Sequence, residues 1–487
     1  MSLRFYNTLT KRKEEFRPLK EGEVRMYNCG PTVYDYAHIG NFRSYIFADI
    51  LRRYLEYKGY RVMQVMNLTD VDDKTIRGSR REGISLKEFT ERYAKAFFED
   101  IRTLNIRPAT IYPRATEHIE EIVEFVKVLM EKGFAYRSED GIYFSIRKFP
   151  DYGKLSGINV KNLKAGARVK QDEYDKEHAH DFALWKFWDE EDGDVYWETD
   201  IGKGRPGWHI ECSVMSTKYL GETFDIHTGG VDLIFPHHEN EIAQSEAKTG
   251  KPFVRYWLHN EHLLVEGRKM SKSLGNFFTL RDLLAKGYEP MAIRYLLLSA
   301  HYRAKLNFTE KALKSAENTV KSLKRFVQDI LDYRHEGNNN PEVDRIIEKA
   351  RRGFETSLDD DLNMPEALPF VFEMISEINT FLSRKEMSTE DAKRVYRLML
   401  RFDSVLGLGL DKISKTHAEK IVDIDGEKYT ISYHDVKPDK EIEKLVIERE
   451  KYRRMKAWKE ADEIRDRLRK KGIILEDVKG GVKVTGA

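Results

Sequence analysis

The chain has 487 residues, which is too long for one hydrophobic core and predicts about three domains. Lysine and arginine number 84 against 82 for aspartate and glutamate, so a surface that binds nucleic acid has to be local. Hydrophobic residues make up 40% and the mean hydropathy is −0.62; without an apolar run of roughly 18 to 20 residues or a signal-peptide core, we expect a soluble cytoplasmic protein with no membrane partner.

A βαβ unit is predicted near the N-terminus. Residues 24–27 are strand-like, and residues 28–32 (Asn-Cys-Gly-Pro-Thr) are too rich in turn formers to continue the strand. From Ile39 apolar residues recur every three to four positions, which predicts a helix that stops at Gly59. Residues 61–67 then predict a second strand. Two strands joined in this way by a helix run parallel, so the unit predicts a doubly wound α/β sheet.

Residues 38–41 (His-Ile-Gly-Asn) lie where the first loop enters this helix. A helix N-terminus presents unpaired amide donors and a partial positive charge to an anion. The side chains of His38 and Asn41 can donate to phosphate oxygens there, and Gly40 leaves room for a flat adenine to approach the backbone. The structural alternative is that the histidine simply caps the helix.

An α/β insertion is predicted over residues 115–200, and the nucleotide-binding fold resumes near Gly207. Residues 269–273 (Lys-Met-Ser-Lys-Ser) then lie in a loop between Gly267 and Gly275. Two lysines three positions apart can converge on a triphosphate and stabilise a pentacoordinate phosphorus and the leaving pyrophosphate by charge. By itself this segment also fits a solvated basic loop.

After about residue 308 the pattern is helical throughout. Residues 338–341 (Asn-Asn-Asn-Pro) predict an interhelix loop, and Asn363 shortly before Pro365 predicts a helix start. Apolar residues that recur every three or four positions predict one buried helical face. They are Leu313, Ala316, Val320, Leu323, Val327 and Ile330. We therefore expect a helical bundle to about residue 410.

The C-terminal region joins a stretch without a clear pattern, residues 411–438, to a compact charged unit. Residues 449–471 hold eleven Lys or Arg against five Asp or Glu, with Trp458 among them. The apolar residues expected to form the buried face of a helix are Ala457, Ala461, Ile464 and Leu468. This pattern fits a solvated amphipathic helix, and equally a surface that stacks on unpaired bases and neutralises phosphates.

Taken together, residues 38–41 and 269–273 resemble the two signatures of class I aminoacyl-tRNA synthetases. Within that class, further segments resemble cysteinyl-tRNA synthetase, namely residues 28–35, 67–74, 204–212 and 235–241, with 458–462 and 472–477 at the anticodon-binding end. The resemblance covers nearly the whole chain. It implies a Rossmann-type catalytic domain and a monomer that uses ATP with Mg²⁺ to make cysteinyl-adenylate from L-cysteine and then charges tRNA(Cys).

A zinc site is implied by the resemblance rather than by ligand spacing, because Cys29 and Cys212 are far apart and would otherwise be taken as buried thiols. His237 and Glu241 lie four positions apart after Pro236, where a helix would bring both to one spot. The family's zinc ligands correspond to Cys29, Cys212, His237 and Glu241, and His238 is a rival for His237. An apolar pocket separates cysteine from serine by only about 1–3 kcal/mol, whereas zinc strongly prefers a thiolate, so no editing domain is expected.

The resemblance also assigns the remaining site residues. ATP binding falls to His38, Gly40, Asn41, Lys269, Met270, Ser271 and Lys272, and transition-state binding to His38, Asn41, Lys269 and Lys272. The cysteine pocket comprises Gly30, Thr32, Thr69, Trp208 and Asp232, and tRNA contacts fall to Trp458 and Asp462. As plainer alternatives, Trp208 fits a core residue and Asp232 a turn residue. Asn41 departs from the class pattern, which usually ends in histidine, and it keeps a donor but carries no charge.

The expected organisation is a Rossmann-type catalytic domain (1–115 and 205–250), a connective insertion (116–204), a junction domain with the second signature (251–308), a helical bundle (309–410) and a C-terminal anticodon-binding domain (411–487). Two rival functions stay open. One is a ligase that gives activated cysteine to an amino sugar, which the basic, aromatic C-terminal unit disfavours. The other is a catalytically inactive RNA-binding protein, which the intact signatures disfavour.

Overall fold

The computed structural model describes residues 2–158, 168–169, 180–270, 275–413, 418–434, 436, 438–478 and 480–486. It divides into two compact units. The first comprises Met1–Val320, Lys349–Glu373 and Ser404–Leu408, and the second comprises Lys321–Glu348, Met374–Asp403 and Gly409–Ala487. Among the described residues no helix is both long and apolar enough to cross a membrane.

A parallel sheet of four strands lies at the centre of the first unit. In spatial order the strands are β11 (Val254–Asn260), β10 (Phe224–Gly230), β3 (Glu23–Asn28) and β4 (Arg61–Met66), and every pairing is parallel. The predicted βαβ unit is confirmed, because α1 (Ile39–Tyr57) joins β3 to β4. Gly59 follows the helix with a φ of +95°, a conformation that favours glycine, and so provides the predicted stop.

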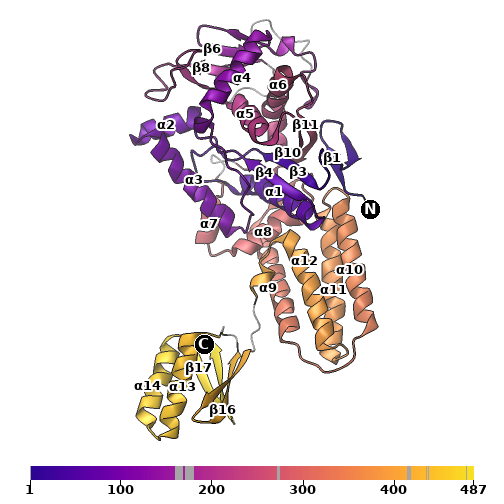
Figure 1. Ribbon diagram of the computed structural model, residues 1–487, viewed down its shortest axis with the longest axis vertical. Helices are drawn as coiled ribbons and strands as arrows, with labels where there is room; N and C mark the ends of the chain where they lie inside the picture. Colours follow the sequence, from indigo (N-terminus) through magenta and orange to yellow (C-terminus); the bar gives the residue numbers. More distant parts are fainter. Residues whose placement is uncertain are drawn as a thin grey trace. The chain divides into compact units, whose positions relative to one another are not determined.

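Helices cover both faces of this sheet. Figure 1 shows α5 (Trp208–Leu220) and α6 (Glu239–Thr249) on one side of the four strands and α1 on the other. Alternate strand residues such as Tyr27 and Val65 enter one apolar core with Cys212 of α5. The carboxyl ends of parallel strands meet at the same edge, so the loops after β3, β4 and β10 are brought together there.

The chain reaches α6 from β10 through two short turns of helix, η4 (Val231–Leu233) and η5 (Ile234–His238). These turns carry Asp232 and His237 directly from the strand edge to the start of α6. Two further helices of this unit, α2 (Asp73–Glu82) and α3 (Leu86–Thr103), follow β4. A small antiparallel pair, β1 (Arg4–Asn7) and β2 (Arg12–Glu15), precedes β3.

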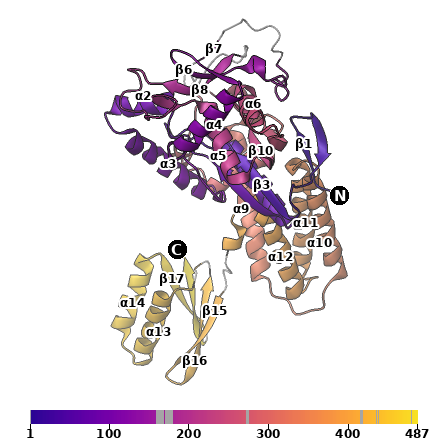
Figure 2. The ribbon, with the colours of Figure 1, turned by 45° about the horizontal axis from the view of Figure 1, so that its top comes forward.

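The α/β insertion expected between the two halves of the fold is present. Its sheet contains β5 (Ala135–Arg137), β6 (Gly141–Phe144), β8 (Asp181–Phe187) and β7 (Arg168–Val169), and β9 (Gly204–Pro206) pairs with β8. α4 (Ile119–Glu131) shares a core with this sheet through residues such as Phe125 and Phe144. Figure 2 shows α4 beside β6 and β8. β9 leads directly into α5, so the insertion returns the chain to the central sheet.

A separate three-stranded sheet carries Lys269, the first residue of the second signature. Its order is β13 (Arg268–Lys269), β12 (Leu263–Val265) and β14 (Leu306–Phe308). Between β13 and β14 lie α7 (Leu280–Ala285) and α8 (Pro290–Ser299). Lys269 is therefore the last residue of a short hairpin strand that pairs with β12.

Four long helices follow, in agreement with the helical prediction for this part of the chain. They are α9 (Glu310–Asp332), α10 (Pro341–Asp359), α11 (Met364–Arg384) and α12 (Thr389–Leu406). The predicted loop lies between α9 and α10, except that its last residue, Pro341, already begins α10, and Asn363 directly precedes α11 as predicted. The six apolar residues predicted to form one face of the first helix are all buried.

The C-terminal part has a mixed four-stranded sheet with two helices. Its strand order is β15 (Ala418–Ile424), β16 (Glu427–His434), β18 (Gly481–Gly486) and β17 (Ile473–Val478). α13 (Lys440–Arg454) and α14 (Trp458–Lys470) pack against it through Val446, Ile464 and Leu468. The stretch 411–438, which had no clear pattern in the sequence, thus contributes two strands to this sheet.

Candidate active site

Four donor side chains meet at the carboxyl edge of the central sheet. Cys29 follows β3, Cys212 lies in α5, and His237 and Glu241 come from η5 and α6. Their sulfur, nitrogen and oxygen atoms all lie within 4.8 Å of one another. His237 Nε2 is 3.1 Å from Glu241 Oε1, and Cys29 Sγ is 3.8 Å from the same oxygen. The structure therefore brings together the four residues that the resemblance assigned to zinc.

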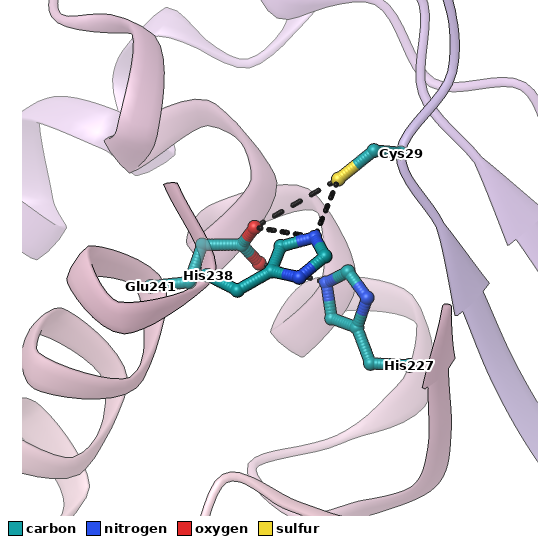
Figure 3. A group of neighbouring side chains, drawn as sticks. All are labelled: Cys29, His227, His238 and Glu241. Carbon is teal, nitrogen blue, oxygen red and sulfur yellow. Dashed lines mark hydrogen bonds and ion pairs between the residues drawn. The ribbon is translucent and has the colours of Figure 1, made fainter. Parts of the chain in front are cut away.

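A second donor group overlaps the first one. The ligand atoms of Cys29, His227, His238 and Glu241 also lie within 4.8 Å of one another. Figure 3 shows these four side chains gathered together. His227 Nε2 is 2.9 Å from Glu241 Oε2, and His238 Nε2 is 3.4 Å from Cys29 Sγ. The two groups share Cys29 and Glu241, so geometry alone keeps His238 a rival of His237. His227 was missed in the sequence, where a histidine inside a buried strand gives no signal of its own.

Two further histidines contact the Nδ1 atoms of His237 and His238, on the side of each ring away from the donor group. His237 Nδ1 is 2.9 Å from His209 Nδ1, so its Nε2 faces the Glu241 carboxylate. His238 Nδ1 is 2.8 Å from His259 Nε2, and His259 Nδ1 is 2.8 Å from Thr8 Oγ1. Such contacts at the far nitrogen fix the orientation and tautomer of an imidazole that binds a metal.

The protonation of this cluster follows from its burial. Burial lowers the pKa of His209 to about 3 and of His259 to about 3. Burial, reinforced by the neighbouring histidines, also holds the pKa of His238 well below its ordinary value. These imidazoles are therefore neutral and can donate lone pairs at neutral pH.

The thiols complete a donor set that needs a cation. Burial, followed by the adjacent Cys212, raises the pKa of the Cys29 thiol well above its usual range. Two thiols, an imidazole and a carboxylate are donor types that Zn²⁺ accepts in tetrahedral sites. A divalent cation would offset the charge of the thiolates, which burial alone disfavours. The residues present therefore fit a zinc ion.

The first signature caps α1. Asn41 N donates to His38 Nδ1 at 3.1 Å, and His38 N donates to Asn41 Oδ1 at 3.0 Å, which is a reciprocal capping box. The structural alternative for His38, a helix cap, is thus realised through Nδ1. Because Nδ1 accepts a hydrogen bond, the proton of a neutral His38 lies on Nε2. Capping and phosphate binding are therefore compatible.

Met270 of the second signature lies beside Gly40 of the first. A Cβ atom built on Gly40 would lie 3.0 Å from the His38 ring and 3.2 Å from Met270 Cε, so the glycine leaves room for both. Ile39 N donates to Phe278 O at 3.0 Å, which ties the segment after the signature to the start of α1. Lys269 is exposed. Ser271 and Lys272 lie outside the described residues.

Three residues of the predicted cysteine pocket meet at the ends of β3 and β4. Gly30 N donates to Asn67 Oδ1 at 2.8 Å, and a Cβ atom on Gly30 would lie only 1.7 Å from Asn67 O. Thr32 and Thr69 are partners in a parallel bridge. A side chain at position 30 would therefore force the two loops apart. Asn67 fixes this junction, although motif reasoning gave it no role.

The other two pocket residues lie on the α5 and α6 side. Trp208 is half-buried at the start of α5, and its ring stacks on His237 with a centroid distance of 4.2 Å. Asp232 is exposed in η4, and its Oδ1 lies 2.3 Å from the position of a Cβ atom on Gly230. Trp208 thus contacts a candidate metal ligand, and Asp232 folds back over the end of β10.

The predicted tRNA-binding residues lie together on α14. Trp458 is the first residue of the helix and is 59% exposed, and Asp462 is exposed one turn later. Ala461, Ile464 and Leu468 are buried as predicted, whereas Ala457 is half-buried and directly precedes the helix, and Trp458 lies on the open face.

Comparison with known proteins first identifies the class. Residues 15–318 match the family model described as tRNA synthetases class I (C) catalytic domain. The solved Mycobacterium tuberculosis methionyl-tRNA synthetase in complex with methionyl-adenylate has the same fold, with a TM-score of 0.61 at 15% sequence identity, over 80% of this chain and 92% of that one. The parallel sheet, with its candidate site at the carboxyl edge, is therefore that of a class I aminoacyl-tRNA synthetase.

Similar proteins of nearly the same length identify the family within this class. Cysteine–tRNA ligase of Chlamydia muridarum is 47% identical over 99% of both chains, and that of Thermococcus onnurineus is 48% identical over 99% of this chain and 98% of the relative. Residues 353–411 match the DALR domain, and residues 437–484 match the cysteinyl-tRNA ligase anticodon binding domain. This chain belongs to the cysteine–tRNA ligase family. The resemblance inferred from the motifs is thereby confirmed.

Proposed function

We propose that the protein activates L-cysteine with ATP and transfers it to the 3′ end of tRNA(Cys), with one zinc ion selecting the substrate thiol. The observation that carries this proposal is the convergence of Cys29, Cys212, His237 and Glu241 within 4.8 Å at the carboxyl edge of the sheet. We further propose that the protein is a cytoplasmic monomer and that it binds ATP together with Mg²⁺.

Adenylate formation requires orientation and charge rather than a protein nucleophile. The carboxylate of cysteine attacks the α-phosphorus of ATP, the new oxygen–phosphorus bond forms, and pyrophosphate leaves. His38 Nε2–H and the Asn41 amide lie at the N-terminus of α1, where they support donation to phosphate oxygens. Lys269 and Lys272 stabilise the charge that builds on the triphosphate, and Gly40, Met270 and Ser271 line the nucleotide.

The zinc ion would be held by the two thiolates, His237 and Glu241, and when bound it supplies a soft centre that coordinates a substrate thiolate far better than a hydroxyl. Trp208 supports the orientation of His237 by stacking on it. Gly30, Thr32 and Thr69 form the wall on the β3 and β4 side, and Asp232 receives the ammonium group of the substrate.

The C-terminal sheet and its two helices provide the proposed contact with tRNA. Trp458 supplies an exposed ring for stacking and Asp462 a hydrogen-bond acceptor beside it. The same helix carries five basic residues, which favour contact with phosphates, namely Lys459, Arg465, Arg467, Arg469 and Lys470.

Amino-acid-dependent ATP–pyrophosphate exchange tests the proposal directly. Cysteine should support exchange and serine should not. Replacing Lys272 by alanine should lower cysteine-dependent exchange by about 10²- to 10³-fold, because a charge at the transition state is lost, while the zinc content stays unchanged. Exchange with serine at a comparable rate, or normal exchange by Lys272→Ala, would contradict the assignment.

A further inference from the structure

Residues 301–304, which join α8 to β14, are held by two buried charges from opposite sides. One charge is the guanidinium of Arg43 on α1, and the other is the carboxylate of Asp361 between α10 and α11. Arg43 is 2% exposed and Asp361 is fully buried. All of these residues belong to the first unit.

Arg43 contacts backbone carbonyl groups. It donates to the carbonyl oxygens of His262 at 3.3 Å, of His301 and Tyr302 at 3.4 Å each, and of Ala304. Burial lowers its pKa to about 10, and Glu261 offsets this effect in part. A buried cation that is solvated by carbonyl oxygens fixes their positions, because moving them would leave the charge without hydrogen bonds.

Asp361 contacts side chains of the same loop. It accepts hydrogen bonds from Tyr302 Oη at 2.5 Å, from Arg303 Nε at 2.7 Å and from the backbone N–H of Tyr6 at 2.8 Å. Its φ of +69° is unusual for a residue other than glycine. Such a conformation persists where the surrounding contacts demand it.

Loop 301–304 is coupled in turn to the second signature. Glu261 N donates to Tyr302 O at 2.8 Å, and Leu306 N donates to His262 O at 3.3 Å. β14 then pairs with β12, and β12 pairs with β13 so that Leu264 lies opposite Lys269. A shift of the loop is therefore transmitted through two strand pairings to the lysine.

Loop 301–304 also contacts α1, the helix that begins within the first signature. Arg43 lies five residues beyond His38 and two beyond Asn41 on α1. The Tyr302 ring stacks on Phe47 of the same helix, with centroids 4.4 Å apart. A small pocket of about 30 Å³, lined by Ile46, Leu297 and Met364 among others, lies beside these rings.

We propose that Arg43 and Asp361 are positioning residues that fix the Lys269 hairpin against the N-terminus of α1 for reaction with ATP. Neither residue touches the substrate in this proposal. The inference rests on the proposed function, because it concerns the residues assigned to ATP. It predicts that loss of the guanidinium contacts of Arg43 or of the Asp361 charge impairs the use of ATP and leaves the cysteine pocket and the metal donors as they are.

Arg43→Lys and Asp361→Asn test the proposal, because both keep the size and the backbone preference of the original residue. Arg52→Lys, on the same helix, and Asp360→Asn, whose partner is Lys13 at 2.8 Å, are matched controls outside loop 301–304. Steady-state pyrophosphate exchange gives kcat and the KM values for ATP and cysteine. Zinc content and Tm are measured on the same samples of full-length protein.

Each test variant should lose about 10- to 100-fold in kcat/KM for ATP, as expected for a displaced reacting group, while the KM for cysteine changes less than twofold and zinc is retained. The double variant should lose less than the product of the two single losses, because both act on one loop. The controls should stay within about twofold of the original protein.

A rise in the KM for cysteine as large as the loss in kcat/KM for ATP, multiplicative losses in the double variant, or kcat/KM for ATP at the level of the controls would each overturn the inference. If a test variant does not fold, Tyr302→Phe removes a single hydroxyl from the same contact and should show the same ATP-specific loss. An original protein without cysteine-dependent exchange would contradict the proposed function instead, so the two failures are distinguishable.

Discussion

At the start of α1, the hydrogen bonds that cap the helix also determine which atoms of His38 face outward. The Nδ1 atom accepts from Asn41 N, and the amide oxygen of Asn41 accepts from His38 N. The capping contacts use one side of each side chain, which leaves His38 Nε2–H and the Asn41 amide group as the proposed phosphate donors. Asparagine in place of the usual histidine thus preserves the cap as well as a donor.

Asn41→Asp separates these two roles. The aspartate keeps the acceptor for His38 N and places a negative charge in the first helical turn, so Tm should stay the same or rise slightly. The same charge faces the proposed triphosphate, so the KM for ATP should rise by about tenfold or more, since 1.4 kcal/mol of repulsion is a factor of ten. Thermal unfolding and exchange kinetics check the prediction; a lower Tm with a normal KM would show that Asn41 only caps the helix.

Zinc analysis of two variants decides between the overlapping donor groups. Cys212 belongs only to the group with His237, and His227 belongs only to the group with His238. Cys212→Ala should lose bound zinc, whereas His227→Ala should keep about one zinc per chain with an affinity weakened by roughly 10- to 100-fold, because it supports Glu241. Metal content after dialysis measures both. The reverse pattern would assign the site to His238.

The residue-level predictions depended on short motifs that carry their own chemistry. Cys29, Cys212, His237 and Glu241 were found because the family resemblance joined segments that are distant in sequence. His227 and His259 were not found, because they lie within buried strands where neighbouring residues give no sign of a polar site. Their role arises only when β10 and β11 pair and bring both to the same edge.

At the level of elements, the C-terminal sheet shows what local patterns do not reveal. β16 pairs with β18 in parallel, with Thr430 opposite Gly481, although α13, α14 and β17 lie between the two strands in sequence. A parallel pairing of this kind has no turn to announce it. The stretch 411–438 therefore gave no prediction, whereas the helix at Trp458 was visible from its apolar stripe. The predicted domain boundaries, such as 411–487, stay predictions.

An ion pair links α13 to β17 in the C-terminal part. Arg449 of α13 donates to both carboxylate oxygens of Asp477 on β17, at 2.8 and 2.9 Å. Arg449 is almost fully buried, so its partner cannot be removed without leaving a buried cation. Asp477→Asn should destabilise this region by about 2 kcal/mol, which corresponds to about 30-fold faster amide exchange in β17 and β18. Hydrogen exchange of the full-length chain measures this, with Glu476→Gln as the neighbouring control.

The same pair predicts a pH dependence. The hydrogen bonds from Arg449 hold the pKa of Asp477 below its ordinary value. A lowered folded-state pKa stabilises the fold above the unfolded pKa of about 3.9, and this contribution is lost as the pH falls through the lower folded value. Protection of β17 should therefore fall below about pH 4 in the original protein, and less so in Asp477→Asn. An equal acid response in both proteins would show that other carboxyl groups control it.

At the scale of the whole molecule, the parts of the chain can be tested separately. Because β15 begins at Ala418, a truncation should end at Ile413 and remove the complete C-terminal sheet; a cut at residue 440 would leave β16 without its partner β18. The shortened protein should keep cysteine-dependent pyrophosphate exchange and lose most tRNA aminoacylation. Normal charging of tRNA would contradict the role of this region and revive transfer of cysteine to another acceptor.

The overall architecture was predictable where amphipathic periodicity is regular. The first βαβ unit predicted the parallel sheet, and the apolar face from Leu313 to Ile330 predicted a long helix. The joining of separate parts was not predictable, because contacts such as those of Asp361 with Tyr302 and Arg303 depend on geometry between distant segments. Periodicity describes one element at a time, whereas buried charges are satisfied only in the assembled fold.

The uneven burial of the donor cluster has a kinetic consequence. Cys212, His237 and Glu241 are almost inaccessible, while Cys29 is half-buried and lies on the side of the loops proposed to form the cysteine pocket. A metal ion held there would leave through the opening by which the amino acid enters. Saturating cysteine should therefore slow the removal of zinc by a strong chelator, and serine should not. If cysteine left the stripping rate unchanged, the ion would have to escape by another route, such as local unfolding of α6.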